Sequence, residues 1–392
     1  MSQSKRSIIT GAAFLMATSA IGPGFITQTT QFTNTLLYSF GFVVLISLVL
    51  DIIVQLNIWR VLGAHQMFAP ELANKVFPYA GHILTALIVL GAFAFNIANI
   101  AGAALGLQVL LGIDLPWGAA ISAVIAAAIF LVKEAGKAMD AFAKVLGFVM
   151  IGLVLYVLTK NSIPVGEVLK NTVMPAKIDT TIILTIVGGT VGGYISFAGI
   201  HRLLQGGIAG TANLSQISRS AVMGITVATV MRALLFLAVL GVVLQQVTLD
   251  PANPAATVFQ QAAGNWGYKL FGLVLWCAAI TSVVGSAFTS VSFAQQHHPA
   301  IKQHHKAATL LFIALSTVLF IAIGKPVPLL LLAGAVNGLV LPFALALILV
   351  AAHKKVFAAR YAHPLWLTVL GWLVVAVMTY MSGYYIKGFL QQ

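Results

Sequence analysis

Two glycine-rich stretches decide the fold: residues 19–25 read SAIGPGF and residues 188–194 read GGTVGGY. Each lies inside an apolar run long enough to cross a bilayer. Glycine costs about 1 kcal/mol in a helix interior and proline about 3 kcal/mol. In hydrocarbon, such breaks persist where they line a cavity, although glycines also serve as kinks or points of close helix packing.

The composition places the chain in a membrane. Of its 392 residues, 60% are hydrophobic and 7% are charged, whereas soluble proteins carry roughly 25% charged residues. The apolar runs are continuous, which indicates helices and not a barrel of alternating strands. Since about twenty residues cross a bilayer, this length accommodates about ten to twelve spans.

Apolar windows between charged residues predict the spans 8–28, 40–62, 81–111, 115–132, 139–159, 181–204, 221–246, 268–294, 307–323, 327–351 and 365–386. The first span is kept as structure and not read as a signal peptide, because no small-residue cleavage site ends it. Most of the 21 Lys and Arg residues become cytoplasmic if the N-terminus is inside. This predicts a multi-pass protein of the cell (inner or plasma) membrane, with its C-terminus outside.

Five spans separate the two breaks, so the helices that carry them enter the membrane from opposite sides. This arrangement is typical of an inverted repeat whose binding site lies at the midplane. The predicted organisation is a first repeat over 1–160, an extracellular connection over 161–180, a second repeat over 181–352 and a last helix over 353–392. Two breaks at matching positions favour a binding site over packing.

With these features the sequence resembles the NRAMP family of divalent-metal transporters, which share the leucine-transporter fold. The resemblance covers nearly the whole chain: the first break, residues 55–63, 95–102 and 189–191, and the LPFA stretch at 341–344. It implies an all-α membrane protein of eleven transmembrane helices, with two inverted five-helix repeats and broken first and sixth helices. It also implies alternating access and a monomer.

The resemblance fails at the family's metal ligands. The family carries Asp-Pro-Gly-Asn in the first break and Met-Pro-His in the sixth span, whereas this chain has GPGF at 22–25 and GGY at 192–194. In the third span, Asn96 and Asn99 match a family Asp and Glu used for proton transfer, and asparagine does not ionise. His201 could titrate, although a polar helix cap is the simpler interpretation. Divalent cations need carboxylates or a dense oxygen or nitrogen shell, so neither manganese nor iron is expected as substrate.

The groups that remain favour a small anion. Helix breaks expose backbone N–H groups that carry roughly half a positive charge, and no acidic side chain is expected nearby. The Gly-x-Gly at 22–24 also looks like the motif with which amino-acid transporters of this fold hold a substrate carboxylate. We therefore expect a secondary transporter of bicarbonate, a short carboxylate or a 5-oxoproline-like acid. The candidate substrate-binding residues are Gly22, Pro23, Gly24, Phe25, Thr27, Gln28, Asn96, Asn99, Thr190, Gly192, Gly193 and Tyr194.

The eighth span offers a sodium site. Its Ala278, Thr281 and Ser282 are similar to the Ala-x-x-Thr-Ser pattern of sodium-coupled relatives, in which both hydroxyls and the Ala carbonyl hold Na⁺. Two first-span carbonyls complete that site, and the matching residues are Thr18 and Ile21. Metal-carrying NRAMP proteins have Gln at the position of Thr281. Because Ser and Thr are also common in transmembrane packing, that alternative stays open.

Two charges lie inside predicted spans, Asp51 in the second and Arg232 in the seventh. An isolated charge there costs several kcal/mol, so each is expected to face a partner or water. The alternatives are a structural pair, a gate or coupling element, or a cation or proton site at Asp51.

The other polar features exclude several function classes. The His297, His298, His304 and His305 loop lacks carboxylates and cysteine, which argues against a metal site. The single cysteine, Cys277, lies in an apolar run, so packing is expected and no disulfide. The charge of +13 is dispersed, which argues against nucleic acid. No nucleotide-binding loop or nucleophile with a base occurs, so the chain is not expected to be an enzyme.

The remaining partners are the bilayer and the substrate, with Na⁺ as the one candidate cofactor. The alternative functions are a divalent-cation (Mg²⁺ or Mn²⁺) transporter and a non-transporting membrane sensor.

Overall fold

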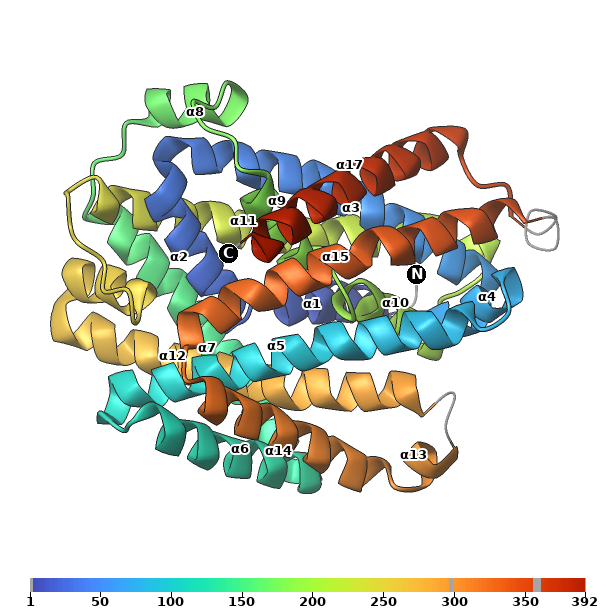
Figure 1. Cartoon of the computed structure of the whole chain (residues 1–392), viewed down its shortest axis with the longest axis horizontal. Helices are drawn as coiled ribbons and strands as arrows, with labels where there is room; N and C mark the ends of the chain where they lie inside the picture. Colours follow the sequence, from blue (N-terminus) through green and yellow to red (C-terminus); the bar gives the residue numbers. More distant parts are fainter. Residues whose placement is uncertain (1–2, 296–298, 355–360, 392) are drawn as a thin grey trace.

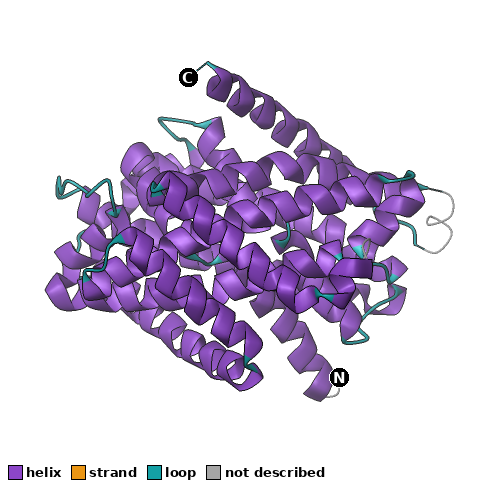
Figure 2. Ribbon diagram, turned by 60° about the horizontal axis from the view of Figure 1, so that its bottom comes forward, coloured by secondary structure: helices purple, strands orange, loops and turns teal. Residues whose placement is uncertain are grey.

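The computed structural model describes residues 3–295, 299–354 and 361–391, with only the backbone described for 3–4 and 133–144. Throughout this part of the chain the structure consists of helices and loops, without strands (Figure 2). The long helices run side by side, and the N- and C-termini lie toward opposite ends of the bundle (Figure 1).

The eleven predicted spans correspond to helices, and the all-helical fold is confirmed. These are α1 (Gln3–Ala20) with α2 (Pro23–Leu36), α3 (Phe40–His65), α5 (Ala80–Leu111), α6 (Leu115–Leu131), α7 (Lys133–Thr159), α9 (Thr180–Val191) with α10 (Ile195–Gln205), α11 (Leu214–Val243), α12 (Pro254–Ala294), α14 (His305–Ile323), α15 (Pro326–His353) and α17 (Leu365–Leu390). By length and composition, 8 segments of the described chain could cross a membrane, and the apolar helices Leu115–Leu131 and Val145–Thr159 are shorter.

Both predicted helix breaks are present. The first separates Ala20 from Pro23, and proline suits the start of α2 because that position has no helical partner for an N–H. The second separates Val191 from Ile195, and within it Gly193 has a φ of +54°. This left-handed conformation favours glycine.

Several boundaries differ from the prediction. The first span continues to Leu36 and not to 28. Most threonines of α2, and Gln28, are buried in the protein interior, and a hydropathy window does not distinguish such a polar helix from a loop. The eighth-span helix begins at Pro254 and is interrupted at Gly264, where φ is +63°. The short elements α4 (Ala69–Val76), α8 (Val165–Val173), α13 (Pro299–Gln303), η1 (Leu37–Ser39) and η2 (Thr211–Asn213) occupy segments predicted as loops.

Glycines bring α9 and α15 into backbone contact. A Cβ atom on Gly188 would lie 2.1 Å from the Gly334 carbonyl oxygen and 2.2 Å from the Gly338 nitrogen. The helix α15 also packs against α5, and Tyr194 at the second break meets Phe95 of α5. This packing places the second break beside the third and tenth spans.

A buried hydrogen-bond network ties the segment before α17 to α3. Arg60 Nε donates to Tyr361 Oη at 3.0 Å, and His363 Nδ1 lies 3.1 Å from the same oxygen. His363 Nε2 lies 2.8 Å from Asn57 Oδ1. Burial lowers the pKa of His363 to about 4, with smaller contributions from Arg60, His353 and His65. The imidazole is therefore neutral in the folded protein near pH 7.

We expect this histidine to make folding stability depend on pH. Its folded pKa of about 4 lies below the ordinary 6.5, so between these values the unfolded chain binds more protons. The stabilisation, at most about 3 kcal/mol, is present above pH 6.5 and is lost as the pH falls toward 4. Thermal unfolding of the detergent-purified protein at pH 7.5, 5.5 and 4.5 should show a smaller fall for His363→Gln than for wild type. The exposed His304 supplies the control, and His304→Gln should follow wild type. An unchanged slope in His363→Gln would contradict the assignment.

Candidate substrate-binding site

The first break packs against the third and eighth spans. A Cβ on Gly22 would lie 3.4 Å from Ser282 Oγ and 3.7 Å from Asn99 Oδ1. Pro23 lies against Gly102 of α5, where a Cβ would come within 2.2 Å of the proline ring. The fold thus brings together three residues predicted from separate spans: Gly22, Asn99 and Ser282.

The second break packs against Asn337 of α15, a residue that the sequence analysis missed. Asn337 Nδ2 donates to the carbonyls of Gly91 at 2.9 Å and Ala333 at 2.8 Å. A Cβ on Gly193 would lie 1.8 Å from Asn337 Oδ1, and that oxygen has no hydrogen-bond donor within the described chain. The sequence feature that could have indicated it is an isolated amide side chain in the middle of an apolar span.

Gln28 connects α2 to α15 beside the second broken helix. Its Nε2 donates to the Leu330 carbonyl at 2.9 Å. Its Oε1 would lie 2.7 Å from a Cβ on Gly189 and has no partner among the described residues. Gln28 is fully buried, and its hydrogen bond links the helix after the first break to α15.

Arg232 reaches both breaks. Its guanidinium carbon lies 4.2 Å from the centroid of the Phe25 ring, and its Nη2 donates to Thr190 Oγ1 at 3.1 Å. The Tyr194 ring meets Phe95 edge to face, with 6.0 Å between centroids. The sequence predicted Arg232 as an intramembrane charge but did not place it against the predicted substrate residues.

The predicted relation between Asp51 and Arg232 holds in part. Their helices, α3 and α11, pack against each other, as expected for neighbouring spans. Within the described residues, however, the one ion pair with nitrogen and oxygen within 4.0 Å is Lys75 with Glu71. The packing of α3 on α11 places Asp51 on the helix next to that of Arg232, and the absence of an acidic side chain at the breaks themselves stays a prediction.

The predicted sodium ligands lie around the first break. The Gly22 N–H bonds to the Ala20 carbonyl at 3.1 Å, so the Thr18 carbonyl loses the partner it would have in a continuous helix. Thr281 Oγ1 donates to the carbonyls of Cys277 at 3.1 Å and Ala278 at 3.0 Å, which leaves its oxygen lone pairs available. Ile21, between the two halves of the helix, is half-buried. Whether these groups bind Na⁺ stays a prediction.

Two hydrogen bonds to α12 hold the side chain of Asn96 in place. Its Nδ2 donates to the Val283 carbonyl and to Ser286 Oγ, both at 2.9 Å. Its Oδ1 is buried without a partner in the described chain. Asn96 and Asn99 therefore present amide oxygens, not ionisable groups, between α5 and α12.

The predicted histidine and cysteine residues lie away from the breaks or in apolar surroundings. The His201 ring lies 4.6 Å from Phe68 and 5.0 Å from Phe293, measured between centroids, so it packs among aromatic rings and is not a polar cap. His305 contacts Phe130 and Phe288. His297 and His298 lie outside the described residues, and Cys277 is buried and free. In the described parts of the chain, no three His, Cys, Asp or Glu residues gather closely enough to hold a metal ion.

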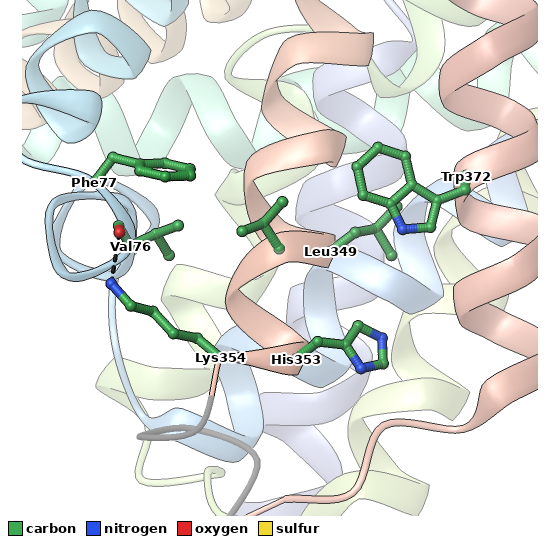
Figure 3. A pocket seen from close by; sticks show the side chains of 7 residues that line it. Val76, Phe77, Leu349, His353, Lys354 and Trp372 are labelled. Atoms are coloured by element: carbon green, nitrogen blue, oxygen red, sulfur yellow. Dashed lines mark hydrogen bonds between the residues drawn. The ribbon is translucent and has the colours of Figure 1, made fainter.

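A pocket of about 420 Å³ lies elsewhere, between the ends of α4, α15 and α17 (Figure 3). It is lined by Val76, Phe77, Leu349, Val350, His353, Lys354 and Trp372. The Lys354 ammonium group donates to the carbonyls of Lys75 and Val76 at 2.8 and 2.6 Å. No residue of either break lines this pocket, so it is separate from the candidate site.

The side chains at the breaks are closed to solvent. Phe25, Thr27, Thr190 and Tyr194 are each exposed by 4% or less. A substrate therefore needs a conformation in which the broken helices have moved apart.

A family model described as natural resistance-associated macrophage protein-like matches residues 13–387. The chain belongs to this NRAMP-like family. Among NRAMP-like relatives, an uncharacterized membrane protein of Bacillus subtilis, YcsG, is 55% identical over 96% of this chain and 94% of its own length. An uncharacterized membrane protein of Haemophilus influenzae is 52% identical over 97% and 96% of the two chains.

Solved structures confirm the fold. A mutant form of the manganese transporter of Eremococcus coleocola superposes with a TM-score of 0.77 at 18% identity, over 98% of this chain and 87% of its own. Mhp1, a nucleobase-cation-symport-1 family transporter in a closed conformation with bromovinylhydantoin bound, gives a TM-score of 0.60 at 14% identity, over 95% and 89%. The NRAMP-like chain therefore has the leucine-transporter fold of a transporter family, and its own site must indicate the substrate.

Proposed function

We propose that this NRAMP-like protein is a secondary active transporter that carries a small anion by alternating access, coupled to Na⁺. The observation that carries the proposal is the structure at Gly192, the position of the family's methionine ligand. A Cβ there would lie 2.3 Å from the Gly188 carbonyl oxygen and 2.7 Å from Asn337 Cβ. The soft metal ligand is thus absent, and its place is filled by another helix.

The charge at the breaks supports an anion. At the positions where the resemblance implies a metal-binding Asp and Asn, this chain has Gly22 and Phe25. The Arg232 guanidinium lies over the Phe25 ring. A buried cation next to the breaks repels a divalent metal ion and attracts a carboxylate or bicarbonate. Bicarbonate, a short carboxylate and a 5-oxoproline-like acid all satisfy this requirement.

The fold alone does not choose between substrates. A manganese transporter and a nucleobase-cation symporter with a bound hydantoin both superpose on this chain. Function therefore has to be argued from the site. The oxygens of Ser282, Asn99 and the Thr18 carbonyl at the first break are of the kind that suits Na⁺.

We expect purified protein in liposomes to take up anions and not metal ions. Mn²⁺, Mg²⁺, bicarbonate, acetate, lactate and 5-oxoproline should be supplied one at a time, with and without an inward Na⁺ gradient. Uptake of at least one anion, increased by the gradient and absent from protein-free liposomes, is the expected result. Mn²⁺ or Mg²⁺ uptake without anion uptake would contradict the proposal and favour a cation site built from backbone and amide oxygens.

A further inference from the structure

The surroundings of Arg232 hold its guanidinium in one orientation. The guanidinium carbon lies over the Phe25 ring, 4.2 Å from its centroid, and Nη2 donates to Thr190 Oγ1. Phe25 follows the first break and Thr190 precedes the second, so each contact comes from a different broken helix. Any relative movement of these helices changes the surroundings of this cation.

One arm of the guanidinium is left without an acceptor. Arg232 is 2% exposed, and its Nη1 forms no hydrogen bond within the described chain. An unsatisfied N–H on a buried charged group is costly, and such groups are ordinarily paired. The edge of the guanidinium away from Thr190 thus lacks a hydrogen-bond acceptor.

Asp51 faces this region from the neighbouring helix without contacting the cation. Its helix, α3, packs against α11, but the two charged groups lie more than 4.0 Å apart, and Asp51 Oδ1 is buried without a partner in the described residues. A purely structural ion pair would be expected to close this distance, since both groups gain from a direct bond. The gap leaves a hydrogen-bonding position on Arg232 unfilled.

We infer that Arg232 binds the carboxylate of a monocarboxylate substrate, and that Asp51 is the counter-ion that competes with the substrate for it. The inference rests on the proposed anion transport and goes beyond it by naming the recognising group. A planar carboxylate fits the edge of a guanidinium through paired N–H···O bonds. The stacked Phe25 ring fixes that edge, so the site selects a carboxylate over the uncharged amide of the same shape.

Acids and their matched amides test this assignment. Acetate, lactate and 5-oxoproline, each beside its primary amide, should be titrated into detergent-purified protein, and apparent affinities taken from the rise in unfolding temperature. In wild type, at least one acid should bind about tenfold or more tightly than its amide, as expected for a charge-assisted hydrogen bond.

Four variants separate recognition from folding. D51N/R232Q removes both charges together, so no unpaired charge remains in the fold, and the acid-to-amide ratio should fall to near one. R232K keeps the charge without the planar edge and should weaken acid binding about tenfold. D51N alone should bind acids more tightly than wild type, because the competitor is gone. Arg219→Gln, an exposed arginine on the same helix, should bind like wild type.

Three failures are distinguishable. A wild-type protein that binds none of the acids would overturn the anion proposal and this inference together. A wild type that prefers acids, with D51N/R232Q folded and retaining the same preference, would overturn the assignment to Arg232 alone. Acid binding in D51N weaker than in wild type would overturn the role of Asp51 as competitor.

Discussion

Replacing Gly193 with alanine should reduce transport to below about a tenth of the wild-type rate, because the second break cannot keep its geometry. Gly193 has a φ of +54°, and a Cβ there would lie 1.8 Å from Asn337 Oδ1 and 3.0 Å from its Cγ. The left-handed conformation costs an alanine about 1–2 kcal/mol before any clash. Initial uptake of the anion identified in liposomes measures the effect, and size-exclusion chromatography checks that the variant is folded.

Gly285, on α12 and outside both breaks, supplies a matched control. A Cβ there would meet no atom within 4 Å. Gly285→Ala should therefore transport at close to the wild-type rate. Adding Asn337→Ala to Gly193→Ala removes the clashing amide and should restore part of the activity, which separates the steric effect from the backbone effect. Equal activity in Gly193→Ala and Gly285→Ala would show that the second break is not constrained as described.

Replacing Ser282 with alanine should raise the Na⁺ concentration for half-maximal uptake by about tenfold or more. Its hydroxyl oxygen lies 3.4 Å from the position of a Cβ on Gly22, at the break whose Thr18 and Ile21 carbonyls are predicted to hold the ion. Loss of one ligand to a charged partner costs about 1.5–3 kcal/mol, which corresponds to at least a tenfold change. Initial uptake rates at a series of Na⁺ concentrations, with the total salt kept constant, measure the shift.

Ser292, on the same helix, gives the comparison. It is half-buried, and its hydroxyl donates to the Phe288 carbonyl at 2.8 Å within the helix. Ser292→Ala should keep the wild-type Na⁺ dependence. If Ser282→Ala also keeps it, or if wild-type uptake is independent of Na⁺, the sodium site is not at this position.

The helix breaks could be predicted from sequence because their cause is local. Glycine and proline in the interior of an apolar run disfavour a continuous helix whatever surrounds them, and the structure interrupts the first and sixth spans at these residues. The extent of α2 could not be predicted, since Thr29, Thr30 and Thr33 are buried by other helices. Hydropathy depends on the residue type and not on which side of a helix meets protein.

The candidate site was also predicted only in part, because sequence patterns are local and contacts between distant helices are not. Gly22, Asn99 and Ser282 carried motif or spacing features, and the fold brings them together. No motif or spacing feature indicated the role of Asn337 or the contacts of Arg232, because these contacts are made with residues that lie far away in the sequence. Arg232 was visible as a charge, but its place over Phe25 was not.

The sequence by itself determined that this chain is a membrane protein, where its helices break, and that the family's metal ligands are missing. These properties follow from residue types and their local order. Only the tertiary structure decided what occupies the vacated positions: Asn337 packed into the second break, and the Arg232 guanidinium stacked beside the first. The physical reason is that glycines let helices from distant parts of the chain approach to backbone contact, and which side chains then meet depends on that packing.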